Sequence, residues 1–141
     1  MTSRKITYIA NIRIPTEKAH GLQVMKSCEA FAYMGIDVSL MVPKRMNPIK
    51  EEPFSYYGVK QNFNVVTIPG SGLAEKLSLS GRVLFNIQAA FFTLKAIRYS
   101  MNMGRKDSVF YSRDLATLFL LCLRGLRPVA EIHDYRLRKP S

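Results

Sequence analysis

The chain has 141 residues, a common size for a single domain, and 48% of them are hydrophobic, which excludes an intrinsically disordered protein. It carries 21 Lys and Arg against 10 Asp and Glu, a formal net charge of +11, which favours phosphate-bearing partners as a class. The sequence has no block of five or more basic residues, so we predict no specific nucleic-acid partner.

Cys28 and Cys122 both lie in apolar runs. We predict that both are buried thiols of a reducing compartment rather than the two halves of a disulfide. The N-terminal residues turn polar too early for a signal peptide, and no apolar run approaches the roughly 20 residues that a transmembrane helix needs. These features predict a cytoplasmic protein.

The first half of the chain alternates strand and helix. Residues 5–11 are an apolar run typical of a strand. Residues 21–34 place apolar side chains at helical spacing, and Gly35 suits the end of that helix. Residues 36–42 and 63–69 are predicted to be the second and third strands, each closed by a proline.

The second half continues the alternation with a long predicted helix at residues 81–103. Its predicted core stripe consists of Val83, Leu84, Ile87, Ala90, Phe91, Leu94 and Ile97. Residues 108–112 are predicted to be a fourth strand, residues 114–125 a helix that Asp114 caps, and residues 129–133 a fifth strand.

Strands that are continuously apolar and alternate with helices predict an α/β fold, with a parallel sheet covered on both faces. We expect a doubly wound, Rossmann-like sheet with strand order 3-2-1-4-5. In such sheets ligands bind beyond the carboxyl ends of the strands. Polar side chains follow three strands, at residues 13–20, 112–114 and 133–135, so we expect the three segments to share one edge.

The familiar cofactor motifs are missing from the sequence. It contains neither the glycine-rich dinucleotide fingerprint nor a P-loop, and its Cys and His residues do not have metal-ligand spacing. No Ser or Cys lies in a nucleophile elbow. We therefore predict no cofactor and no metal.

Three runs, residues 13–45, 109–114 and 131–134, together resemble the N-terminal domain of family-4 glycosyltransferases of the GT-B fold. The resemblance implies one Rossmann-like half of a GT-B architecture, with residues 1–141 as an incomplete N-terminal domain and the donor-binding C-terminal domain absent. It also implies retaining transfer of a sugar from a nucleotide-sugar donor to a glycan or lipid acceptor. The chain alone is then expected to be inactive.

The loop after the first strand supplies most of the candidate binding residues. The resemblance places substrate near Gly21, where a helix N-terminus can approach a phosphate or sugar; the alternative is tight packing of helix on strand. Arg13, Glu17 and Lys18 are candidate substrate contacts or simply a solvated charged loop. His20 is a candidate substrate contact or a side chain that braces the loop.

The other candidates follow the fourth and fifth strands. His133 is the candidate catalytic residue, because similar enzymes place a histidine at this strand end near the transferred sugar. Asp134 is a candidate substrate contact, and Glu131 is either an orienting partner of His133 or a buried carboxylate paired with a basic residue. Arg113 suits an anionic or hydroxyl-rich ligand, whereas Asp114 is interpreted as a helix cap.

Two alternatives stay open. A minority interpretation places the long helix on the inner face of an anionic membrane through Arg82, Lys95 and Arg98, as a peripheral contact. The alternative function is a non-catalytic Rossmann-like module that binds a nucleotide or a partner chain.

Overall fold

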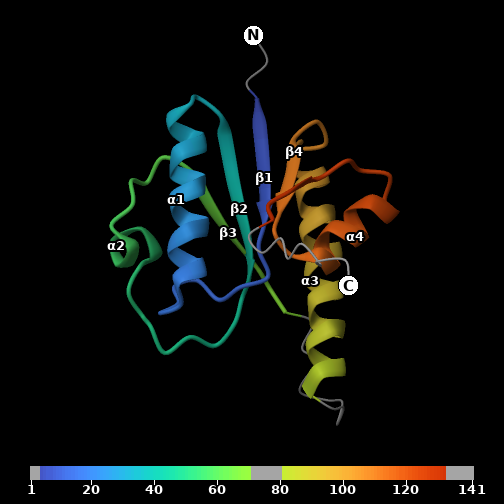
Figure 1. Ribbon diagram of the computed structural model, residues 1–141, viewed down its shortest axis with the longest axis horizontal. Helices are drawn as coiled ribbons and strands as arrows, with labels where there is room; N and C mark the ends of the chain where they lie inside the picture. The colour runs from blue at the N-terminus through green and yellow to red at the C-terminus, as the bar shows by residue number, and fades with distance from the viewer. Residues whose placement is uncertain (1–3, 71–80, 133–141) are drawn as a thin grey trace, which may run out of the picture.

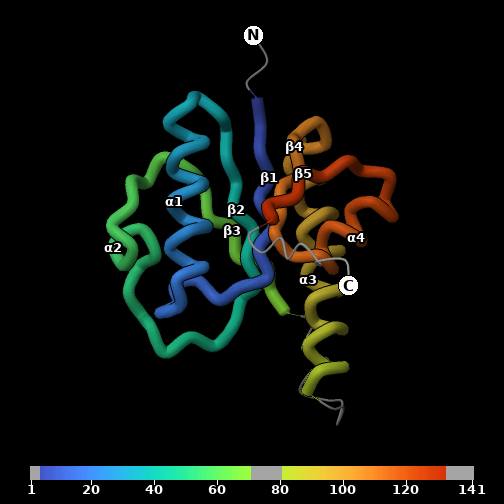
Figure 2. The backbone as a smooth tube through the Cα atoms, in the orientation of Figure 1, coloured from blue at the N-terminus to red at the C-terminus, as the bar shows by residue number. Residues whose placement is uncertain are grey.

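A computed structural model of the chain describes residues 4–70 and 81–132. Within these residues one sheet contains the strands β1 Lys5–Ile9, β2 Asp37–Pro43, β3 Asn64–Ile68, β4 Val109–Ser112 and β5 Val129–Ala130. All neighbouring strands pair in parallel, in the order β3-β2-β1-β4-β5 (Figure 1). The predicted Rossmann-like sheet with strand order 3-2-1-4-5 is confirmed. Figure 2 follows the chain into β5, which runs beside β4 at the end of the sheet.

Helices cover both faces of this sheet (Figure 1). Their bounds are α1 Ala19–Tyr33, α2 Pro53–Tyr57, α3 Gly81–Asn102 and α4 Leu115–Leu123. Tyr8 and Leu40 belong to the core under α1 and α2, whereas Ile9 and Met41 belong to the core under α3 and α4. Successive strand residues thus fill opposite cores, which explains why the strands read as continuous apolar runs.

The ends of the helices follow the expected chemistry. Gly35 and Gly104, which follow α1 and α3, adopt left-handed backbone conformations with φ of 81° and 68°. Asp114 caps α4, because its carboxylate accepts hydrogen bonds from Thr117 N at 3.2 Å and Thr117 Oγ1 at 2.7 Å. The predicted cap is confirmed. Helix α1 begins at Ala19, so Gly21 lies inside its first turn instead of opening the helix.

The predicted core stripe of α3 was only partly correct. Val83 and Phe91 are 47% and 40% exposed. The face that is buried consists of Ala89, Phe92, Thr93, Ala96, Ile97 and Ser100. The first turns of α3 project past the edge of the sheet, so apolar side chains there have no strand to cover (Figures 1 and 2). Thr93 is tolerated in the core because its hydroxyl pairs with that of Thr117 at 3.2 Å.

The prediction for Cys122 was wrong: Cys28 is buried, but Cys122 is exposed. Helix α4 is apolar on every side, so its sequence did not indicate which side faces the sheet. Its buried residues are Thr117 and Leu121. None of the helices in the described part of the chain combines the length and the hydropathy needed to cross a bilayer.

Arg105 holds the neighbouring strands β1 and β2 together at their amino ends. Its side chain is 8% exposed and donates through Nε to Thr7 Oγ1 at 3.0 Å and through Nη1 to Asp37 Oδ2 at 3.0 Å. Nη2 donates to the carbonyls of Ile6 at 2.7 Å and Asp37 at 3.0 Å. The connection from α3 to β4 is therefore fixed to β1 and β2 at the edge opposite the polar strand ends.

We expect Arg105→Ala to lower the free energy of unfolding by about 2–4 kcal/mol, because several buried acceptors lose their donor at once. Urea denaturation followed by circular dichroism measures the effect. Lys106→Ala removes the same charge from the exposed neighbouring position and should change stability by less than about 0.5 kcal/mol. Equal losses in the two variants would contradict the structural role of Arg105.

Candidate functional site

Three strand ends meet at the carboxyl edge of the sheet, the lower edge in Figure 1. The loop after β1 and the first turn of α1 provide Asn11 and His20, the chain after β2 provides Arg45, and the chain after β4 provides Arg113. Since β2, β1 and β4 are neighbours and parallel, these segments leave the sheet side by side.

Two adjoining pockets lie between these segments. The first, here named the Arg113 pocket, has a volume of about 230 Å³ and is lined by Ala10, Asn11, Ile12, His20, Phe85, Arg113 and Asp114. The second, the Arg45 pocket, has a volume of about 480 Å³ and is lined by Asn11, Ile12, Arg13, Thr16, Glu17, Lys18, His20, Arg45, Met46 and Phe85. The pockets share Asn11, Ile12, His20 and Phe85, so they form two halves of one hollow.

His20 borders both pockets from the first turn of α1. Partial burial lowers the pKa of its imidazole below the ordinary value of 6.5, and the positive charges of Arg113 and Lys18 lower it further. The imidazole is therefore neutral at pH 7 and can accept a hydrogen bond as well as donate one.

The charged side chains of the loop have different surroundings. Arg13 forms an ion pair with Glu17, and the pKa of Glu17 is held below its usual range first by its own backbone N–H and then by Arg13. Lys18 is the N-cap of α1; its backbone N–H donates to the Thr16 hydroxyl at 3.3 Å, and its side chain makes no cap hydrogen bond. The Arg45 pocket is lined by the cations Arg13, Lys18 and Arg45 and one carboxylate, a net charge of +2.

Arg45 is the residue of this site that the sequence did not single out. Its Nη2 donates to Asn11 Oδ1 at 2.6 Å, and its guanidinium lies over the ring of Phe85, 5.7 Å from the centroid. Partial desolvation lowers the pKa of the Arg45 guanidinium, although the residue as a whole is exposed, and an arginine stays charged in a protein. Its position directly after β2 was the available signal, because that strand end points to the same edge as β1 and β4.

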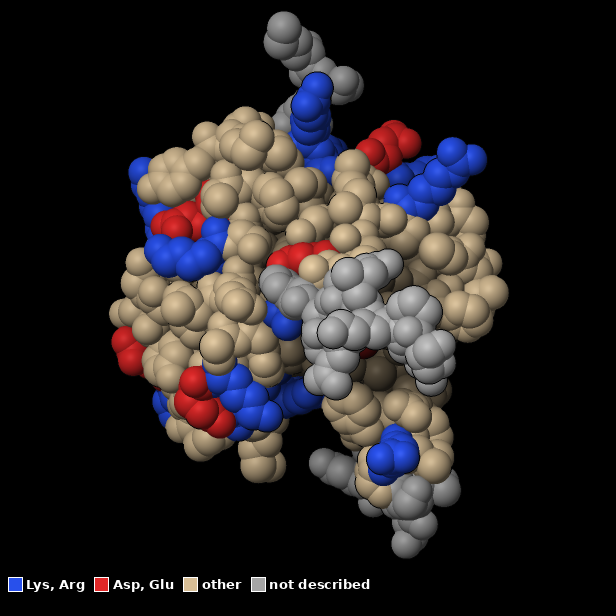
Figure 3. Space-filling view, in the orientation of Figure 1, with Lys and Arg blue, Asp and Glu red and all other residues tan. Residues whose placement is uncertain are grey.

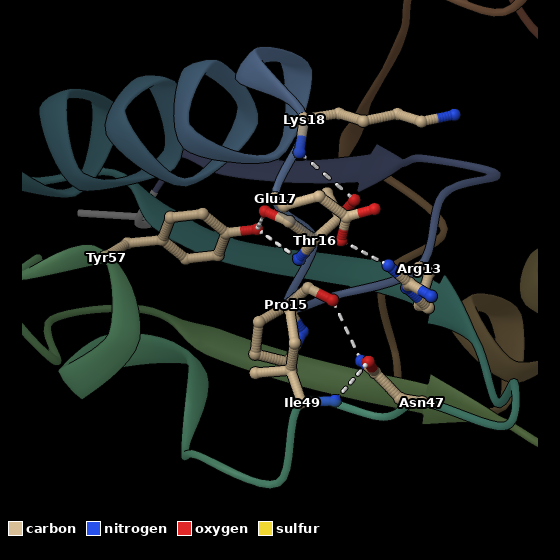
Figure 4. Close-up of polar contacts among 8 residues, drawn as sticks. All are labelled: Arg13, Pro15, Thr16, Glu17, Lys18, Asn47, Ile49 and Tyr57. Atoms are coloured by element: carbon tan, nitrogen blue, oxygen red, sulfur yellow. Dashed lines mark hydrogen bonds and ion pairs between the residues drawn. The ribbon is translucent and has the colours of Figure 1, made fainter.

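A hydrogen-bonded frame fixes the loop between β1 and α1 (Figure 4). The Tyr57 hydroxyl accepts from Thr16 N at 2.6 Å and donates to Thr16 O at 2.9 Å. Asn47 Nδ2 donates to the Pro15 carbonyl at 2.8 Å, while Asn47 Oδ1 accepts from Ile49 N at 3.0 Å. The loop is thus held by two other segments, which allows it to present Arg13, Glu17 and Lys18 in fixed places.

Gly21 is explained by packing within this frame. A Cβ at this position would lie 2.3 Å from the Tyr57 hydroxyl oxygen and 2.5 Å from Thr16 Cγ2. The Gly21 N–H already bonds the Lys18 carbonyl at 3.1 Å. The space beside the glycine is filled by Tyr57 of α2 and Thr16 of the loop, so close packing explains the glycine, although its neighbours are not the strand that the sequence alternative named. Contact of Gly21 with a substrate stays a prediction.

The structure brings most of the other predicted residues together. Arg13, Glu17, Lys18 and His20 line the Arg45 pocket, and Arg113 lines the Arg113 pocket, with its Nη1 donating to Gln23 Oε1 at 3.3 Å. Their contact with a substrate stays a prediction. His133 and Asp134 lie outside the described residues, so the predicted catalytic role of His133 and the predicted substrate contact of Asp134 also stay predictions.

Glu131 has a partner that neither sequence alternative named. Its carboxylate accepts a hydrogen bond from the Tyr8 hydroxyl at 2.9 Å, and its N–H donates to the Ser112 carbonyl at 3.0 Å. Burial raises the pKa of Tyr8, and the hydrogen bond to Glu131 raises it further. Burial and a hydrogen bond to Glu131 raise the pKa of Tyr111 to about 12. Glu131, the residue after β5, therefore links this end of the sheet to Tyr8 of β1 and Tyr111 of β4.

Basic side chains are scattered over the face shown in Figure 3, interleaved with acidic ones and separated by uncharged surface. This distribution differs from the continuous basic stripe of a nucleic-acid-binding surface. On this face the basic side chains form separate groups and not one continuous patch.

Comparisons with known proteins agree with the fold. No family model and no curated protein matches the sequence. Among solved structures, UGT2 of Phytolacca americana matches with a TM-score of 0.61 in the apo form, at 14% identity over 89% of this chain. The same protein complexed with UDP-2-fluoro-glucose and pterostilbene matches with 0.62, at 15% identity over 91%.

A UDP-glucosyltransferase from Polygonum tinctorium that is capable of glucosylating indoxyl, in complex with 3,4-dichloroaniline, matches with a TM-score of 0.58, at 11% identity over 91% of this chain. The chain spans 28% to 30% of the lengths of these proteins. The chain therefore has the fold of one part of a GT-B-like glycosyltransferase structure.

We expect Gly21→Ala to destabilise the protein by about 1–3 kcal/mol, because the added methyl group displaces Tyr57 from the backbone of Thr16. Gly81→Ala, at the first residue of α3, is the matched control, because no atom of the described residues beyond its own stretch of chain lies within 4 Å of the new Cβ. That control should be neutral or stabilising by up to about 1 kcal/mol, as for an ordinary helical glycine. Thermal unfolding of both variants tests the difference, and an equally stable Gly21→Ala variant would disprove the packing explanation.

We expect His20 to titrate below pH 6.5, because its folded-state pKa is depressed. Between the folded-state pKa and pH 6.5 the unfolded chain therefore binds more protons than the folded chain. The contribution of His20 to stability is complete above pH 6.5 and is lost as the pH falls through the folded-state pKa. NMR titration of the imidazole Cε1–H, assigned with His20→Gln, measures the value. Arg113→Gln should raise it; an unchanged pKa would show that Arg113 does not act on His20.

Proposed function

We propose that this chain is the acceptor-side, N-terminal domain of a glycosyltransferase that moves a sugar from a nucleotide-sugar donor to a glycan or lipid acceptor. The observation that carries the proposal is the hollow at the carboxyl edge, where His20, Arg45 and Arg113 from three separate segments line two adjoining pockets. A two-substrate transfer requires two adjacent binding places, and this edge of a Rossmann-like sheet is where such ligands bind.

The side chains at the hollow suit this chemistry. Arg113 supplies a fixed positive charge beside the smaller pocket, and neutral His20 can hydrogen-bond a sugar hydroxyl at the border of the two pockets. Charges that are already in place cost no reorganisation when the negative charge of a leaving phosphate develops. The UDP-sugar bound to one structural neighbour supports a nucleotide-sugar as the donor class.

The finer assignments rest on the sequence resemblance. Residues 13–45 and 131–134 support membership of family 4, retaining transfer, and a role of His133 near the transferred sugar. In this proposal the donor is held mainly by a second, C-terminal domain. Residues 1–141 alone then bind substrate without catalysing transfer. The peripheral membrane contact through Arg82, Lys95 and Arg98 belongs to the same proposal, as one way to reach a lipid acceptor.

We expect the chain to bind UDP-glucose weakly and Arg113→Gln to weaken that binding about tenfold, the size of one charge-assisted hydrogen bond. Isothermal titration with UDP-glucose, UDP and uridine measures the affinities. Arg127→Gln, which removes an exposed charge outside both pockets, is the matched control and should bind as the unmodified chain does.

Absence of UDP-glucose binding, both alone and after addition of a donor-binding domain, would contradict the proposal. UDP binding that Arg113→Gln and Arg127→Gln weaken equally would favour the alternative of a non-catalytic, charge-driven binding module.

A further inference from the structure

The Arg45 pocket combines a fixed cation with an apolar wall. Asn11 and Phe85 hold the guanidinium of Arg45 from two sides, by a 2.6 Å hydrogen bond and by the ring contact at 5.7 Å. The two partners come from different elements, the loop after β1 and helix α3, so the guanidinium is positioned by tertiary contacts. Ile12, Met46 and Phe85 line the same pocket with apolar surface.

This cation has no carboxylate partner among the described residues. The ion pairs found there are Arg13–Glu17, Lys26–Glu29 and Arg105–Asp37. Asn11 satisfies one donor direction of Arg45 and leaves the charge unneutralised. Because Lys18 lines the pocket as well, an anionic ligand would meet two cations that form no ion pair within the described residues, in a pocket whose net charge is +2.

The position of the pocket separates it from the donor side of the proposed reaction. The Arg45 pocket opens between the ends of β1 and β2, whereas the Arg113 pocket opens between the ends of β1 and β4. His20 lines both pockets and lies at the border between them. A sugar held at this border could reach a group bound in the larger pocket without leaving the hollow.

We propose that the Arg45 pocket binds the acceptor and that the acceptor carries a phosphate beside an apolar or ring-shaped body. The inference rests on the proposed function and extends it by naming the class of acceptor and the residues that select it. Arg45 pairs with the phosphate, and Phe85 packs against the body. A neutral polyol acceptor would leave the charge of Arg45 desolvated and unmatched.

The test uses phenyl phosphate as the probe, with inorganic phosphate and phenol as its two separate halves. We expect phenyl phosphate to bind at least about tenfold more tightly than either half. Arg45→Gln should weaken binding about tenfold or more, whereas Lys44→Gln, the same charge change at the exposed neighbouring residue, should leave it unchanged.

Phe85→Leu should weaken phenyl phosphate several-fold more than it weakens inorganic phosphate, because the phosphate alone does not contact the ring. Phe91→Leu is its control, because Phe91 is 40% exposed on the same helix but outside both pockets. Replacing the probe by hexyl phosphate or by glucose 6-phosphate distinguishes two kinds of acceptor. Tighter binding of hexyl phosphate indicates a lipid-linked acceptor, and tighter binding of glucose 6-phosphate indicates a soluble phosphorylated one.

Saturation with UDP separates this inference from the proposed function. Phenyl phosphate that still binds in the presence of UDP supports a separate acceptor pocket, whereas competition with UDP would overturn it. Equal losses in Arg45→Gln and Lys44→Gln, or no binding of phenyl phosphate by a chain that binds UDP-glucose, would overturn this inference alone. Phenyl phosphate binding by a chain that binds no nucleotide-sugar, either alone or after addition of a donor-binding domain, would overturn the acceptor assignment together with the proposed function.

Discussion

The central position of β1 is the constraint on which the rest of the structure depends. Tyr8 and Ile9 are fully buried on opposite faces, and the strand pairs in parallel with β2 and β4. Parallel pairing sends the chain after all three strands out at the same edge. Every segment that lines the two pockets leaves from one of these strands or begins a helix beside them. Burial of the sheet on both faces thus brings these segments together, and the hydrogen bond from Arg45 to Asn11 then joins the chain after β2 to the loop after β1.

The loop after β1 is held by a frame of residues outside it. Tyr57 supplies that frame by bonding both backbone groups of Thr16, and the absence of a side chain at Gly21 makes the approach possible. The positive end of helix α1 faces the same hollow, with Lys18 as its N-cap and no acidic residue in its first turn. The polarity of the site is therefore set by a helix dipole and by side chains of the same sign.

Local sequence patterns were sufficient for the sheet and for most of the loop site. Continuous apolar strands alternating with helices have one common solution, a parallel sheet with its polar strand ends at one edge. His20 and Arg113 were found by that reasoning, since each follows a strand that packing places in the middle of the sheet. The pattern failed for α3 and for Cys122, where helices are apolar on more than one side and periodicity does not identify the buried face.

By itself the sequence determined the order of the elements, the parallel topology and the charge of the chain, because these follow from local periodicity and composition. Only the tertiary structure decided that Gly21 leaves room for Tyr57, that Glu131 accepts a hydrogen bond from Tyr8, and that Arg45 bonds Asn11 beside the hollow. Each of these contacts joins residues that are 34 or more positions apart. No local pattern encodes such a pairing, because the distance between two side chains is set by how the helices and strands between them pack.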